Sequence, residues 1–154
     1  MAGRTMASFL GTDTYAIDHK GRLAIPMSFR RGDGRKKPLT SFVLAEGLDG
    51  CLALYPLDEW ARVEERLRKI PMGGRKGRAF KRAFLLNCVK VSVDAQGRIT
   101  IPPALMNRAG LGKEAILHGV LNRIEIWAPE RLNLELQQAQ DQLESLAEDV
   151  LREE

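Results

Sequence analysis

The chain has 154 residues, 44% hydrophobic and 29% charged, a composition typical of a folded globular protein and not of a disordered or membrane-spanning one. Its net charge of +4 is uneven: residues 1–128 hold 22 basic against 12 acidic side chains and residues 129–154 hold 2 against 8, so the basic body suits a polyanionic partner. Without paired cysteine clusters, neighbouring histidines, a nucleophile elbow, a phosphate loop or an HExxH motif, we expect no metal, no cofactor, no small-molecule substrate and no enzyme.

The N-terminal stretch "MAGRTMASFLGTD" contains too few apolar residues for a secretory signal, so we expect a cytoplasmic protein without a membrane partner. The alternating segment "TYAID" then predicts a half-buried strand. Asp18 and Gly21 predict a tight reversal, because Asp accepts backbone N–H groups in an Asx turn and Gly tolerates a positive φ. Arg22 opens a second alternating segment, and Pro26 ends it and starts a short helix.

The next part of the chain predicts an exposed loop, a β-hairpin and two helices. The loop is "RRGDGRKKPLTS", and the hairpin "SFVLAEGLDGCLALYP" turns at residues 48–50. "PLDEWARVEERLRKIP" spaces its apolar residues as one face of an amphipathic helix, and "KGRAFKRAFLLN" predicts a basic helix after it. Residues 66–82 contain eight basic side chains and no acid. This run fits a solvated helix face, a phosphate-attracting surface or a subunit contact.

The same order of elements then recurs. "DHKGRLAIP" at residues 18–26 returns as "DAQGRITIP" at residues 94–102, an offset of 76, and "LALYPLDEW" aligns with "IEIWAPERL" at an offset of 72. Between them, "PPALMNRAG" predicts a short helix closing on Gly110, and "EAILHGVLNRIEIWAP" predicts a second hairpin. The repeat predicts two β units, at 9–56 and 88–128, joined by a helical connector at 57–87.

The acidic tail, residues 129–154, predicts an amphipathic helix. Its apolar residues recur at spacings of 4, 3, 4, 3 and 4, which is typical of a helix-packing seam: Leu132, Leu136, Ala139, Leu143, Leu146 and Val150. Since its other residues are strongly acidic, we expect it to pack back on the basic body, or on a neighbouring subunit, rather than to form a free coiled coil.

The repeated turn is the strongest candidate for function. A two-stranded β-ribbon fits the major groove of DNA, and an Arg side chain on it can donate two hydrogen bonds to guanine O6 and N7. The alternative is structural: Arg22 and Arg98 pair with Asp18 and Asp94, four residues earlier, and only fasten the turn. The aromatic residues Tyr55, Trp60 and Trp127 are expected to be core or interface residues rather than base-stacking platforms.

Four stretches carry a resemblance to a known family: "FLGTDTYAIDHKGRLAIP", "GLDGCLALYPLDEW", "DAQGRITIPPAL" and "IEIWAPERL". The tandem turns resemble paired AbrB-type swapped-hairpin domains, and the flanking text resembles the MraZ family over nearly the whole chain from Phe9. The resemblance implies an α+β fold with two tandem AbrB-like swapped-hairpin β units related by pseudo-twofold symmetry, connecting helices and a C-terminal helix.

The resemblance also implies a function. MraZ-like proteins are sequence-specific DNA-binding regulators of the bacterial division and cell-wall gene cluster, which assemble into rings and bind short direct repeats in their own promoters. The implied partner is double-stranded DNA, the implied location is nucleoid-associated, and the implied assembly is a homo-oligomer. The implied DNA-binding positions are Lys20, Arg22, Gln96 and Arg98, where Gln96 departs from the expected Lys. Two alternatives remain: an AbrB-type antitoxin, or a ring-forming assembly factor that binds protein.

Overall fold

The computed structural model describes residues 7–32 and 34–152, so the last two residues of the expected C-terminal helix lie outside it. The first unit comprises β1 (Thr12–Ala16), β2 (Arg22–Ala24), α1 (Met27–Arg31), β3 (Ser41–Glu46), the 3-10 turn η1 (Leu48–Gly50), β4 (Leu52–Pro56), α2 (Leu57–Arg68) and α3 (Arg75–Leu86). The second comprises β5 (Val89–Ser92), β6 (Arg98–Thr100), α4 (Pro103–Ala109), β7 (Glu114–Gly119), β8 (Ile124–Trp127), α5 (Pro129–Asp141) and α6 (Leu143–Leu151). The two units therefore repeat one order of strands and helices, which confirms the predicted tandem α+β fold.

The strands of the two units are exchanged. The six-stranded sheet has the order β1-β7-β8-β4-β3-β5, so the first strand of each unit pairs with the third strand of the other. The fourth strands, β4 and β8, meet at the centre, and β2 pairs with β6 in a separate two-stranded ladder. The pairing is thus symmetric about a pseudo-twofold axis. Both units contribute strands to one sheet, so no break in the sheet marks where one unit ends and the next begins. The boundaries of the units therefore stay predictions.

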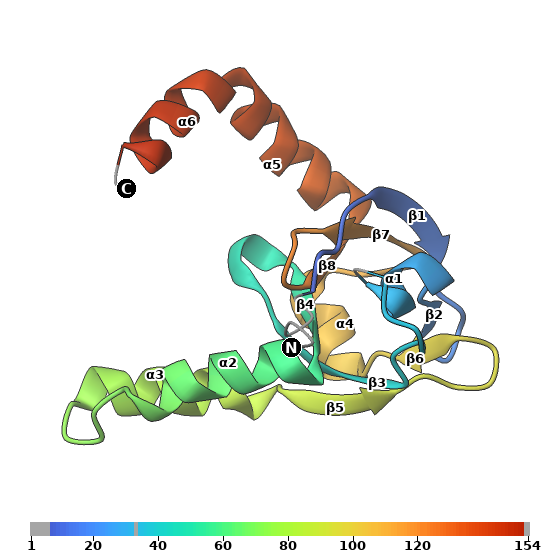
Figure 1. Ribbon diagram of the computed structural model, residues 1–154, viewed down its shortest axis with the longest axis horizontal. Helices are drawn as coiled ribbons and strands as arrows, with labels where there is room; N and C mark the ends of the chain where they lie inside the picture. The colour runs from blue at the N-terminus through green and yellow to red at the C-terminus, as the bar shows by residue number, and fades with distance from the viewer. Residues whose placement is uncertain (1–6, 33, 153–154) are drawn as a thin grey trace.

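One hydrophobic core lies between the large sheet, the β2–β6 ladder and the short helices α1 and α4 (Figure 1). Leu23 and Ile99, at the middle of the ladder, are fully buried. Phe9 packs edge-on against Phe29 of α1. Since each paired position in a ladder faces the same side, burial of Leu23 and Ile99 turns the neighbouring residues of β2 and β6 outward.

The helices α2 and α3 are held together by aromatic side chains. Trp60 lies between Tyr55 and Phe84, with ring centroids 5.7 and 6.2 Å away, and Phe84 stacks on Phe80. Trp127 is buried in a second small cluster with Cys51 and Leu132. The prediction that the tryptophans and Tyr55 serve packing is confirmed for this chain. Chain connectivity brings α3 back to the body, because β5 follows it and pairs with β3.

The acidic tail differs from the prediction. It forms two helices, α5 and α6, with a break at Gln142 (φ −114°, ψ 12°), whose N–H donates to the Ala139 carbonyl. The start of α5 is anchored by buried Leu132, but α6 has no buried residue and points away from the sheet (Figure 1). Within its own chain α6 therefore does not pack on the basic body, and the other expectation, that it packs on a neighbouring subunit, stays a prediction. None of the described helices is long and apolar enough to cross a bilayer.

Candidate nucleic-acid interface

The two repeated turns have the same backbone geometry. In the first, Asp18 Oδ1 accepts the N–H groups of Lys20 (3.0 Å) and Arg22 (2.9 Å), and its carbonyl accepts the Gly21 N–H (3.0 Å). In the second, Asp94 Oδ1 accepts the backbone N–H groups two and four residues later, both at 2.9 Å. The turn glycines have φ of +78° and +79°. Both predicted Asx turns are therefore formed, each with a glycine where the backbone requires a positive φ.

Each arginine folds back on the aspartate of its own turn. Arg22 Nε donates to Asp18 Oδ2 at 2.6 Å, and Arg98 Nε donates to Asp94 Oδ2 at 3.1 Å. The Arg22 backbone N–H, together with its side chain and the Lys20 N–H, lowers the pKa of Asp18 to about 2, and the equivalent contacts lower that of Asp94. Both carboxylates are thus ionised at neutral pH. One interpretation of the sequence is that each arginine pairs with the aspartate four residues earlier and fastens the turn. That contact is present in both turns.

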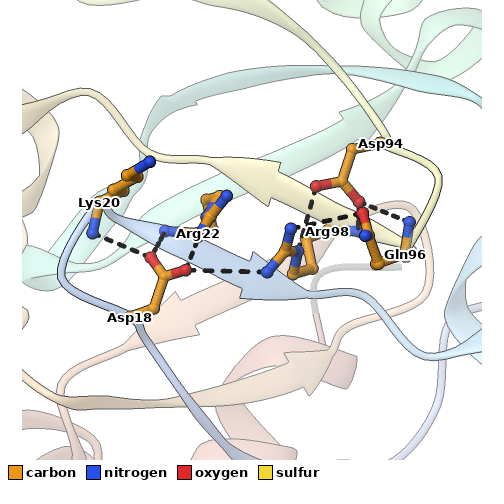
Figure 2. A network of polar contacts seen from close by, with 6 residues as sticks. All are labelled: Asp18, Lys20, Arg22, Asp94, Gln96 and Arg98. Carbon is orange, nitrogen blue, oxygen red and sulfur yellow. Dashed lines mark hydrogen bonds and ion pairs between the residues drawn. The ribbon is translucent and has the colours of Figure 1, made fainter.

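The ladder brings the two turns side by side. Arg22 is opposite Thr100 and Ala24 is opposite Arg98, so the outward face carries its two arginines at diagonal corners, each opposite a small side chain. Carbonyls of the two turns accept the N–H groups of Ile25 and Ile101 across the axis, at 2.8 and 2.9 Å. Figure 2 shows the resulting network, in which Arg98 Nη1 also lies 3.8 Å from Asp18 Oδ2. The outer face of this ladder, which we call the arginine ribbon, is one surface built from both units.

The arginines of the ribbon are not sealed in the core. The side chains of Arg22 and Arg98 retain 30% and 27% of their exposure. Lys20 and Gln96, two residues earlier in each case, are exposed. The structure therefore brings all the predicted site residues to one accessible face.

The two turns hold their arginines differently. Arg98 Nη2 donates to Gln96 Oε1 at 3.4 Å, in addition to the contacts with both aspartates. For Arg22 the described residues provide a partner at Nε only. The terminal nitrogens of Arg22 are thus fixed in direction through Nε but have no protein acceptor in the described chain. This arrangement presents the forked end of a guanidinium, which is the geometry that recognises guanine or phosphate.

Arg30 is a further candidate that the sequence interpretation missed. Its Nε donates to the Ile25 carbonyl at 2.8 Å, and a Cβ added to Gly97 would lie 2.8 Å from its Nη2, so it lies against the second turn. It brings a positive charge to the turn that has Gln96 in place of Lys. No pattern in the sequence indicates this contact, because α1 of one unit meets the turn of the other only through the strand exchange.

Comparison with known proteins places these features in a family context. A family model described as "MraZ protein, putative antitoxin-like" matches the chain twice, over residues 8–83 and 84–153. Three similar proteins are each named transcriptional regulator MraZ. The protein of Natranaerobius thermophilus is 38% identical over 143 residues, which is 93% of this chain and 96% of the relative. Those of Pelotomaculum thermopropionicum and Limosilactobacillus reuteri are 43% and 42% identical over 93% and 92% of this chain and 95% and 96% of the relatives.

Proposed function

The chain belongs to the MraZ family of transcriptional regulators, and on this premise we propose that it binds double-stranded DNA in a sequence-specific manner through the arginine ribbon. Lys20 and Arg22 make the principal contacts, and Arg98 makes weaker ones. Gln96 lies at the same face and modulates Arg98. Membership of a family of regulators sets aside an enzymatic function.

The observation that supports this proposal is the pairing of β2 with β6. It places two partly exposed arginines at diagonal positions of one ladder, where each is opposite a small side chain, Thr100 or Ala24. A two-stranded ladder of this kind fits the major groove, where an arginine recognises guanine with two hydrogen bonds. The four basic side chains at the ribbon, Lys20, Arg22, Arg30 and Arg98, exceed the two aspartates, so phosphate attraction assists.

One ribbon contacts too little DNA for high specificity, because one bidentate pair contributes only about 1–3 kcal/mol of discrimination. Repetition of the ribbon in a homo-oligomeric ring raises the affinity without new contacts, provided that the spacing of the DNA boxes matches the spacing of the subunits. We therefore include in the proposal short direct repeats in the protein's own promoter, within the division and cell-wall gene cluster, and a cytoplasmic, nucleoid-associated location.

Selection of bound sequences from a random DNA pool tests this function without assuming an operator. We expect enrichment of tandem boxes that contain guanine, and binding that weakens steeply as salt rises. Recovery of no sequence, together with no binding at low salt, would refute DNA recognition. That outcome would favour the assembly factor that binds protein, which needs no contact with phosphate. The antitoxin alternative also binds DNA and differs in binding a toxin through its C-terminus.

A further inference from the structure

We propose that α6 of one copy of this chain docks into a groove beside α3 of a second copy. This α3 groove has a volume of about 530 Å³, and the residues that matter to the argument are Leu48, Tyr55, Arg66, Phe80, Phe84 and Arg108. The inference deepens the assembly part of the proposed function by identifying the two surfaces that meet. It does not depend on DNA recognition.

The apolar face of α6 has no partner within its own chain. Leu143, Leu146 and Val150 are 66%, 40% and 64% exposed, and their spacings of three and four residues place them on one side of the helix. Glu144 and Asp149 flank that side. An isolated helix of fewer than about 12 residues is only marginally stable in water, so a nine-residue helix with an exposed apolar face needs a packing partner.

The α3 groove offers the complementary apolar surface. Phe80 is 51% exposed and stacks on Phe84, and Leu48, which also lines the groove, is 78% exposed. Aromatic rings and a leucine at the edge of a groove accept aliphatic side chains from an amphipathic helix, which is a recurrent mode of recognition. The groove therefore offers a surface on which the leucine face of α6 loses apolar exposure to water.

The charges of the α3 groove and of the C-terminal tail are also opposite in sign. The groove is lined by Arg66, Arg108 and Arg123 against a single acid, Glu46, and Arg66 makes no ion pair with the described residues. The tail from residue 129 onward has two basic and eight acidic residues. Complementary potentials guide association and exclude wrong partners. Arg108 and Arg123 are already paired with Glu46 and Glu125, so a neutral apolar partner would leave Arg66 unmatched.

A second copy is the occupant, because α6 and the α3 groove of one chain lie apart. Figure 1 shows α5 and α6 leaving the sheet on a different side from α2 and α3. Each chain thus carries one donor helix and one acceptor groove, and the contact is head-to-tail. Repeated head-to-tail contacts give a closed ring when the rotation closes, as the proposed function requires, or a filament when it does not.

Mixing two full-length variants tests the contact directly by sedimentation velocity without DNA. The tail variant, Leu146→Glu with Val150→Glu, keeps its groove, and the groove variant, Phe80→Glu with Arg66→Glu, keeps its tail. We expect each alone to sediment as a monomer and an equimolar mixture to form a one-to-one heterodimer. Ser145→Glu and Arg82→Glu, which alter charge outside the contact, are the matched controls and should assemble as the parent does. Circular dichroism melts verify that each variant is folded.

Three results would overturn the proposal: a monomeric parent, assembly of either variant at the parent's size, or a mixture of folded variants that stays monomeric. Failure of the DNA selection with an intact heterodimer would reject the proposed DNA function and leave this contact standing. Normal DNA selection with no heterodimer would reject the contact between α6 and the α3 groove and leave the proposed DNA function standing.

Discussion

Arg98 of the second turn extends across the pseudo-twofold axis, so that its Nη1 lies 3.8 Å from Oδ2 of Asp18 in the first turn. Asp18 therefore contacts the arginines of both units, whereas Asp94 bonds the arginine of its own turn. The two copies of one motif are thus coupled and unequal. The inequality has consequences for DNA binding, for acid stability and for substitution of the glycines.

Arg22→Ala is expected to leave the fold intact and to weaken binding to the selected DNA strongly. Loss of one bidentate base contact costs about 1–3 kcal/mol, or roughly 5- to 150-fold in affinity. Arg98→Ala should have the smaller effect, because that guanidinium is already engaged by Asp94, Gln96 and Asp18. Fluorescence anisotropy with a labelled duplex measures both, and Arg82→Ala is the control. Full binding by a folded Arg22→Ala protein would remove Arg22 from the site.

Exchanging the residues that precede the turn glycines should shift the salt dependence of binding. Lys20→Gln removes a cation from the ribbon, and Gln96→Lys adds one and frees Arg98 Nη2 from its amide acceptor. One phosphate contact changes the slope of log K against log salt by about one. We expect a shallower slope for Lys20→Gln and a steeper slope with tighter binding for Gln96→Lys. Identical slopes for the two variants and the parent would place these side chains outside the DNA contact.

The Asp18 carboxylate should contribute a pH-dependent part of the stability. Its folded pKa, about 2, lies below the ordinary value of 3.8, so the unfolded chain binds its proton more readily. The contribution is complete above the unfolded value and disappears as pH falls through 3.8 toward 2. Urea unfolding should show the stability gap between the parent and Asp18→Asn shrinking from pH 6 to pH 2.5. A gap that stays constant over this range would show that the ionised Asp18 carboxylate, with its hydrogen bonds and ion pairs, stabilises the fold no more than the protonated form does.

Gly21→Ala should destabilise the protein more than Gly97→Ala. Both alanines would occupy the left-handed region at a cost of about 1–2 kcal/mol. At Gly21 the new Cβ also lies 2.8 Å from the Ile101 carbonyl oxygen, which belongs to the ladder backbone, whereas at Gly97 it meets the end of the Arg30 side chain. Gly112→Ala, with open space around it, is the control in thermal melts. Equal melting temperatures for the two turn variants would contradict this ranking.

Most local structure was predictable from the sequence because it depends on neighbouring residues. The Asp18 and Asp94 turns, the short helices after Pro26 and Pro102, and the helices α2 and α3 all follow from spacing, capping and turn chemistry. The partner of the ladder strand β2 did not follow from its own three residues. Its pairing with β6, and the placement of Arg30 against the second turn, arise from contacts between residues that are 67 to 78 positions apart.

The direction of the tail also could not be predicted from the local sequence pattern. The leucine spacing correctly predicts helix, but a break at Gln142 preserves that spacing while it changes the axis. Packing direction depends on what lies beside a helix in space, and periodicity carries no such information. The prediction is therefore confirmed for helical content and wrong for a single unbroken helix, whereas packing of α6 on a neighbouring subunit stays a prediction.

The sequence by itself determined that the chain is a duplicated unit, that each copy turns at Asp-x-x-Gly, and that an arginine follows each turn, because these features are encoded within nine residues. Only the tertiary structure decided that both arginines lie on one ladder and that Asp18 holds the pair. The physical reason is strand exchange. A β-strand satisfies its backbone hydrogen bonds with whichever strand the fold places beside it. Here the other unit of the same chain provides that strand.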